Sequence, residues 1–130
     1  MNFKINSEIT LSNKILLKET KYKMIKNHFA VCRNQNAIII YGNTLLFDKI
    51  EADVQLYYNF KEFLEKIVIT IFPPNYRYIQ SFLIQEYGEP SIIKENENVC
   101  WEIDDCRISH CVMDHFGDIE MISAEWIDEK

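Results

Sequence analysis

Apolar and polar side chains alternate along residues 99–126, and this alternation constrains the fold more than any other feature of the chain. Val99, Trp101 and Ile103 alternate with small or polar residues, and Asp104-Asp105 then fits a two-residue hairpin turn. A turn at this place fixes the pairing of the two strands beside it. The pairs are Ile103 with Cys106, Trp101 with Ile108, Val99 with His110 and Glu102 with Arg107.

We expect a second hairpin turn at His115 to Gly117. A three-residue loop there would place the glycine where a left-handed conformation is needed. The sequence therefore predicts a three-stranded meander with two distinct faces. The predicted buried face carries Val99, Trp101, Ile103, Ile108, Val112, Ile122, Ala124 and Trp126. The opposite face carries Cys100, Glu102, Arg107, Ser109, Cys111, Met113, Ile119, Met121 and Glu125.

Further elements precede the meander. Residues 52–58 alternate as a half-buried strand, and residues 66–72 are apolar on both faces, which is typical of a central strand. A helix is predicted to open at Asn75 as N-cap and to end at Gly88, with Pro90 beyond it.

Nearer the N-terminus, Phe3 and Ile5 suit a short strand, and a basic helix is predicted to begin after Thr20. Residues 37–41 are apolar, and Gly42-Asn43 reads as a turn. The predicted fold class is α+β: a single domain, 1–130, with one antiparallel sheet, two helices packed on one face and the C-terminal meander.

Charge is segregated along the chain. Residues 1–35 carry seven Lys and Arg against two Asp and Glu, whereas residues 95–130 carry eleven Asp and Glu against two basic residues. The net charge of −6 opposes binding to nucleic acid and favours a cationic partner. The first residues lack the apolar stretch of a signal peptide, and no run is long enough to span a bilayer, which predicts a cytoplasmic protein with reduced cysteines and no membrane partner.

The residues that could carry chemistry do not form a recognisable site. Three glycines cannot supply a phosphate-binding loop. A cluster of thiols and imidazoles between residues 100 and 115 lacks the paired spacing of zinc ligands, and strand alternation would send its members to opposite faces. We therefore predict no enzymatic activity, no metal and no cofactor.

One surface stands out on the outward face of the meander, where Met113, Ile119 and Met121 lie among carboxylates. Adaptable methionines beside carboxylates suit a binding surface for a basic partner. Two explanations stay open: the face meets a partner, or another element of the chain covers it.

The C-terminal half resembles the immunity proteins of contact-dependent and polymorphic toxin systems in bacteria. The similarity covers roughly residues 50–127 and rests on layout: Tyr87-Gly88-Glu89-Pro90 after a helix, Trp101 in the next strand, Asp114-His115-Phe116-Gly117 at a hairpin and Trp126 near the end. It implies a cytosolic, non-catalytic inhibitor that binds one toxin domain. Many such toxins are basic nucleases.

We therefore predict that an acidic surface occludes the active site of a basic toxin. The predicted contact residues are Glu102, Asp104, Asp105, Met113, Asp114, Asp118, Glu120 and Met121. The alternative is a small-ligand-binding or scaffold protein that uses Trp101, Tyr58 and Phe82. A metal-assisted hydrolase using Asp114, His115 and Asp118 is the least favoured reading.

Overall fold

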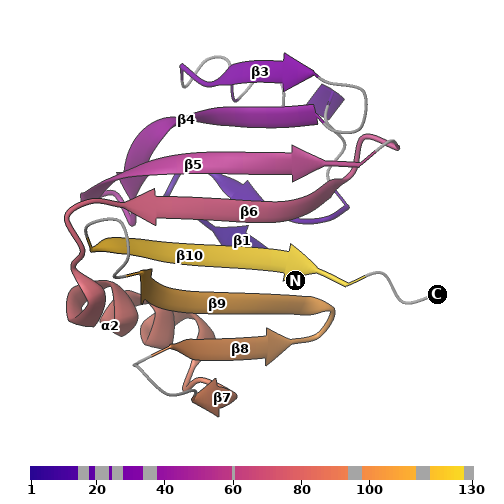
Figure 1. Ribbon diagram of the computed structural model, residues 1–130. Coiled ribbons are helices and arrows are strands. Elements are labelled where there is room, and N and C mark those ends of the chain that lie inside the picture. Colours follow the sequence, from indigo (N-terminus) through magenta and orange to yellow (C-terminus); the bar gives the residue numbers. More distant parts are fainter. Residues whose placement is uncertain are drawn as a thin grey trace.

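One large antiparallel sheet organises the molecule. The computed structural model describes residues 1–14, 18–19, 24, 28–33, 38–59, 61–93, 98–113 and 118–127. Eight strands lie in the order β3-β4-β5-β6-β10-β9-β8-β7, and β1 and β2 form a separate two-stranded sheet (Figure 1). The early elements are β1 (Phe3–Lys4), β2 (Thr10–Leu11), β3 (Ala30–Arg33), β4 (Ile38–Leu46), β5 (Ile50–Tyr58) and β6 (Leu64–Ile71). The later ones are helix α2 (Tyr76–Tyr87), β7 (Ile92–Ile93), β8 (Val99–Ile103), β9 (Cys106–Met113) and β10 (Ile119–Trp126).

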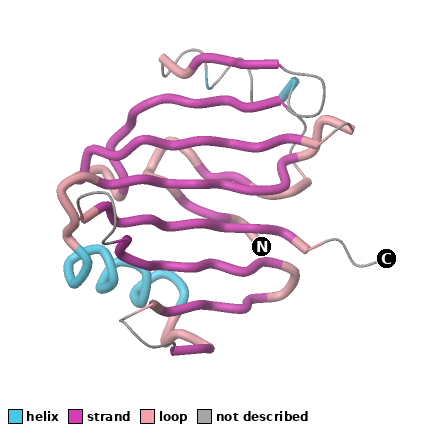
Figure 2. Tube along the Cα trace, viewed as in Figure 1, coloured by secondary structure: helices cyan, strands magenta, loops and turns pink. Residues whose placement is uncertain are grey.

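The sheet consists of two four-stranded meanders joined by α2. Strands β3 to β6 follow one another across one half, and β7 to β10 follow one another across the other half (Figure 2). The halves meet where β6 pairs antiparallel with β10. This position explains why residues 66–72 read as a central strand: β6 has neighbours on both sides.

The β1–β2 hairpin and α2 cover one face of the sheet, which we call the inner face. Figure 1 shows both elements behind the sheet. Ile79 and Leu83 of α2 are fully buried, and the Phe3 ring of β1 stacks on Tyr87 of α2 with ring centroids 5.8 Å apart. The opposite, outer face carries neither element.

The predicted arrangement of two helices on one face is wrong, because the described chain is mostly strand and holds one helix, α2. A hairpin lies beside that helix instead. The Asn6 side chain accepts hydrogen bonds from the backbone N–H groups of Glu8 and Ile9, which closes a tight turn between β1 and β2. The predicted basic helix falls mainly on residues 20–23 and 25–27, outside the described residues.

The predicted C-terminal register is confirmed. Ile103 pairs with Cys106, and Glu102 pairs with Arg107, as the two-residue turn requires. The predicted second helix is also confirmed, although Asn75 makes no side-chain capping hydrogen bond. The predicted loop from His115 to Gly117 lies outside the described residues.

The turn predicted at Gly42-Asn43 does not exist, since β4 runs straight through it. A β-carbon at Gly42 would lie 2.6 Å from Cδ1 of Phe29, so the glycine is needed for the close approach of that ring. The chain turns instead at Phe47 and Asp48, whose φ angles are 55° and 64°. Tertiary contacts hold this strained turn: the Phe47 N–H donates to the Ile5 carbonyl over 2.8 Å, and Asp48 accepts hydrogen bonds from Ser7.

Candidate functional site

The outer face presents a partly exposed apolar cluster at one end of the central strands, beside the point where β6 ends. We call this cluster, formed by Phe72, Met113, Ile119 and Met121, the methionine patch. Met113 lies directly opposite Ile119, and Met121 lies opposite Cys111 and Thr70 in the strand register. Phe72 directly follows β6 and is 72% exposed, and Met113 is 43% exposed. Large apolar side chains grouped in this way are typical of a surface that meets another molecule.

Carboxylates border the methionine patch. Asp53 lies opposite Thr70, which in turn lies opposite Met121, and Asp118 immediately precedes β10. Glu51 is exposed on the same face of β5, two residues before Asp53. Across the strands, no described residue level with Met121 or with Ile119 is a lysine or an arginine. The rim is therefore anionic.

The other end of the outer face is different, because its charges alternate in sign. Across the strands, Lys66 lies opposite Glu125, and Glu125 lies opposite Arg107. Arg107 forms an ion pair of 3.0 Å with Glu102. A hollow of about 470 Å³ opens beside Lys66 and Glu125. Because cations and anions pair off along this row, it has no dominant charge.

The structure divides the predicted contact residues that it describes among the β8–β9 turn, the methionine patch with its rim, and the buried inner face. Asp104 and Asp105 form the β8–β9 turn, where Asp105 lies 3.6 Å from the N-terminal ammonium group, and Glu102 lies near them. Met113 and Met121 belong to the methionine patch and Asp118 to its rim, near the far end of β9. The eight residues of β9 separate the two ends by roughly 25 Å at the usual rise of a strand. Asp114 lies outside the described residues.

Glu120 is not available to a partner, because its side chain is 0% exposed on the inner face. Its neighbours Ile122 and Ala124 alternate onto the same buried face. Strand alternation places Glu120 on the same face as Ile122 and Ala124, which is the inner face. Its charge alone led to the wrong prediction that it lies on the outer surface.

The buried Glu120 belongs to a polar network beneath the methionine patch. Its carboxylate pairs with Nε2 of His110, which is also 0% exposed, and its other oxygen accepts the backbone N–H of Asn75 over 2.6 Å. Nδ1 of His110 lies 2.5 Å from Oε1 of Gln80 in α2. The Tyr76 ring stacks on the imidazole with centroids 4.1 Å apart.

Both ring nitrogens of His110 have a hydrogen-bond partner, one in Glu120 and one in Gln80. The Glu120 carboxylate has a second partner in the Asn75 N–H. The buried polar groups of this network are therefore satisfied, whereas removal of either His110 or Glu120 leaves the other without its partner.

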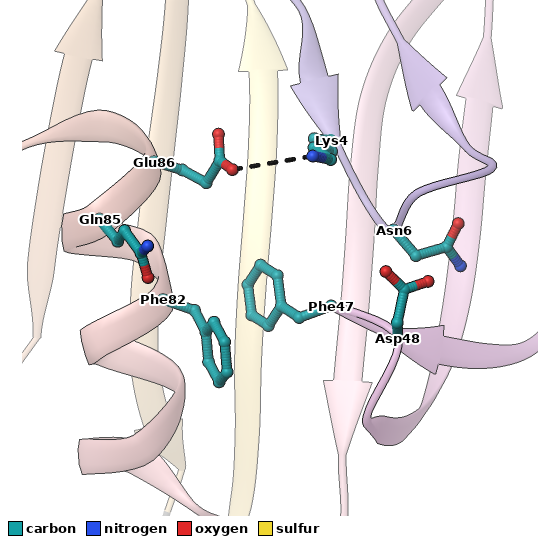
Figure 3. Close-up of a pocket in the computed structure, with 7 residues that line it drawn as sticks. All are labelled: Lys4, Asn6, Phe47, Asp48, Phe82, Gln85 and Glu86. Atoms are coloured by element: carbon teal, nitrogen blue, oxygen red, sulfur yellow. Dashed lines mark ion pairs between the residues drawn. The ribbon is translucent and has the colours of Figure 1, made fainter.

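A small recess separates α2 from the β1–β2 hairpin (Figure 3). It measures about 200 Å³, and the Lys4–Glu86 ion pair of 4.0 Å spans it. The Phe47 and Phe82 rings stack inside it with centroids 4.8 Å apart. Its volume is below the usual range of ligand pockets, and these groups already contact one another. We interpret the recess as the packing seam between helix and hairpin.

Trp101 and Tyr58, which the alternative of a small-ligand protein needed, are buried in the core. The indole N–H of Trp101 donates to the Gly88 carbonyl over 2.8 Å. Within the part of the chain that the structure describes, no three His, Cys, Asp or Glu side chains are grouped so as to hold a metal ion. No described helix is long and apolar enough to cross a membrane.

The thiols of β9 differ in their surroundings. Burial, followed by the charge of Asp105, raises the pKa of Cys106 to about 12. Burial and the nearby Glu120 charge also raise the pKa of Cys111, which lies half-buried on the outer face. Neither cysteine is therefore an activated nucleophile near neutral pH.

Sequence reasoning missed Phe72, Glu51 and Asp53. Phe72 was interpreted as the end of an apolar strand, whereas β6 ends at Ile71 and Phe72 follows it with an exposed ring. Glu51 and Asp53 join the rim only because β5 pairs with β6, a long-range contact that no local pattern specifies. Comparisons with protein-family models, curated proteins and solved structures give no match.

Proposed function

We propose that this chain is a non-enzymatic binding protein of the immunity type, which acts in the cytosol and neutralises a basic toxin domain by covering its active site. The contact surface is the methionine patch with its acidic rim. The single observation that carries the proposal is the exposed apolar group around Phe72 and Met113. Such residues form the desolvated centre of protein interfaces.

Charge supports a cationic partner. The rim residues Glu51, Asp53 and Asp118 have no basic residue beside them in the described rows, and the whole chain carries a net charge of −6. Anionic rims steer basic partners and speed their association. Glu102, Asp104 and Asp105 lie at the other end of the sheet, so they can add to the long-range field without contacting the same epitope.

Titration calorimetry against a panel of basic bacterial nuclease-toxin domains, including any encoded beside this chain, tests the proposal. A variant with Glu51→Lys, Asp53→Lys and Asp118→Lys is expected to bind at least about tenfold more weakly than the natural chain. The apolar centre is tested separately by Phe72→Ser, which should also lose at least about tenfold in affinity.

The matched control is a variant with Glu102→Lys, Asp104→Lys and Glu125→Lys at the far end of the sheet, which reverses the same number of charges without touching the patch. If the control and the rim variant weaken binding equally, the effect comes from net charge and not from contact at the rim. Weakening in the control alone would move the contact surface to the β8–β9 turn. Failure of every domain in the panel to bind would remove the toxin-inhibitor proposal.

A further inference from the structure

The row of charges at one end of the outer face is complementary to itself. Lys66 of β6, Glu125 of β10, Arg107 of β9 and Glu102 of β8 follow one another on neighbouring strands, so the sign alternates from strand to strand (Figure 1). A two-fold axis that lies above the outer face and runs along the strands, midway between β10 and β9, exchanges these two strands and also exchanges β6 with β8. Each charge of the row then faces the opposite charge of a second copy, Lys66 facing Glu102 and Glu125 facing Arg107.

The same axis also matches the rest of the outer face of these strands. Residues that lie level with one another on β10 and β9 come to face each other between the copies, so Ser123 faces Ser109 and Ile119 faces Met113. The small serines let the two sheets approach, and Met113, which is 43% exposed in the single chain, gains an apolar neighbour. The operation therefore brings apolar side chains to apolar side chains and cations to anions.

An axis across the strands, midway between their two ends, does not have this property. It would place the charged row of one copy over the methionine patch of the other, so that Glu125 would face Ile119 and Arg107 would face Met113. A charge covered by an apolar side chain loses water and gains no partner, which costs free energy. The charge pattern thus selects the axis along the strands, with the two sheets aligned as in a β-sandwich.

The overlap has the size of a weak but specific interface. Six strands of each copy, from β5 to β7 in the sheet order, face six strands of the other, while β3 and β4 stay uncovered. At the usual spacings of a sheet, six strands about 23 Å long offer at most roughly 650 Å² per copy. Specific interfaces bury about 800 Å² per partner, so the expected dimer lies near the lower limit and dissociates readily.

We propose that this chain forms a reversible homodimer, in which the outer faces of two copies pack together about a two-fold axis along β9 and β10. The second copy covers the methionine patch and so removes exposed apolar surface from water. The hollow beside Lys66 receives the Glu102 side chain of the second copy. This inference does not rest on the proposed function, although a toxin domain bound at the methionine patch would exclude the second copy.

Sedimentation velocity from about 1 μM to about 1 mM chain tests the dimer without any other protein. The natural chain should sediment as a monomer at the lowest concentration and as a dimer at the highest. Lys66→Glu sets like charges against each other at both symmetry-related contacts and should weaken the dimer at least about tenfold. Met113→Ser should weaken it too, whereas Leu45→Ser, at a comparably exposed apolar residue of the uncovered β4, should not.

A charge swap makes the test specific for this axis. Within one chain, Lys66 and Glu102 lie three strand spacings apart, about 14 Å, and cannot pair. In the double variant Lys66→Glu with Glu102→Lys, the two positions attract each other only between copies. Dimerisation should therefore return to within about threefold of the natural chain, although the neighbouring charges within each chain remain mismatched.

A natural chain that stays monomeric throughout the concentration range would overturn the proposal. A dimer that Lys66→Glu leaves intact, or that the charge swap fails to restore, would overturn it as well, because the interface would then lie elsewhere. A dimer weakened by Leu45→Ser and not by Met113→Ser would do the same. The concentration series on the natural chain keeps the test decisive even where a variant fails to fold.

Discussion

The two faces of β9 and β10 differ sharply, although their residues alternate one by one along the same strands. On the inner face, His110 and Glu120 are fully buried and satisfied by α2 and by the Asn75 backbone. On the outer face, Met113 is 43% exposed beside Ile119 and Met121. The comparison teaches that the face of a strand, rather than the type of residue, decides whether a side chain belongs to the core or to a surface.

The inner face is also the more demanding of the two. A polar group there must find its partners within the protein, since its side chain is closed off from solvent. The exposed methionines have no such requirement, so the outer face is free to specialise for contact. Substitutions on the two faces of one strand should therefore have very different effects.

The largest effect is expected for Glu120→Ala. This change removes the buried partner of His110 and the acceptor of the Asn75 N–H, and breaking a buried pair costs about 3–5 kcal/mol of unfolding free energy. Met113→Ala, on the outer face, should cost less than about 1 kcal/mol. Urea unfolding of both variants measures the contrast, and equal losses would contradict the distinction between the faces.

A double variant sharpens the same contrast. With His110→Leu and Glu120→Leu together, neither member of the pair is left buried without the other, so the double variant should be more stable than Glu120→Ala. If the pair is instead required for folding by itself, the double variant will be the least stable of the set.

Gly42→Ala is expected to have the next largest effect. Gly42 lies against the Phe29 ring on the inner side of β4, and an added methyl group would overlap that ring at 2.6 Å. Overpacking of this kind costs about 1–3 kcal/mol. Asn43→Ala, one residue along and exposed, is the control and should change the unfolding free energy by less than about 0.5 kcal/mol. A tolerated Gly42→Ala would show that Phe29 can move aside.

Local patterns predicted the C-terminal half of the fold well. The alternation around Trp101 and the short turn at Asp104-Asp105 specify a register without help from distant residues, and the register is confirmed. The helix signals around Asn75 and Gly88 are equally local. Where the determinants lie within one hairpin or one helix, the sequence is enough.

Prediction failed where a distant ring or backbone decides the conformation. Gly42-Asn43 has the composition of a turn, yet Phe29 requires the glycine within a strand. Phe47 and Asp48 have no glycine, yet contacts with Ile5 and Ser7 hold them in a turn. The sites show the same division: Met113 and Met121 follow from alternation, whereas Asp53 reaches the rim through the pairing of β5 with β6.

The smallest expected effect concerns the two β9 thiols at alkaline pH. Burial raises the pKa of Cys106 from 9.0 to about 12 on the inner face. The folded chain therefore keeps a proton that the unfolded chain releases. The stability from this group is complete below about pH 9 and declines as pH rises toward 12, by at most about 1.4 kcal/mol per pH unit.

Urea unfolding from pH 7 to pH 10 should show a shallower decline for Cys106→Ala than for the natural chain. Cys111→Ala on the outer face should change the slope of unfolding free energy against pH less than Cys106→Ala does. The reverse order would contradict the deeper burial of Cys106.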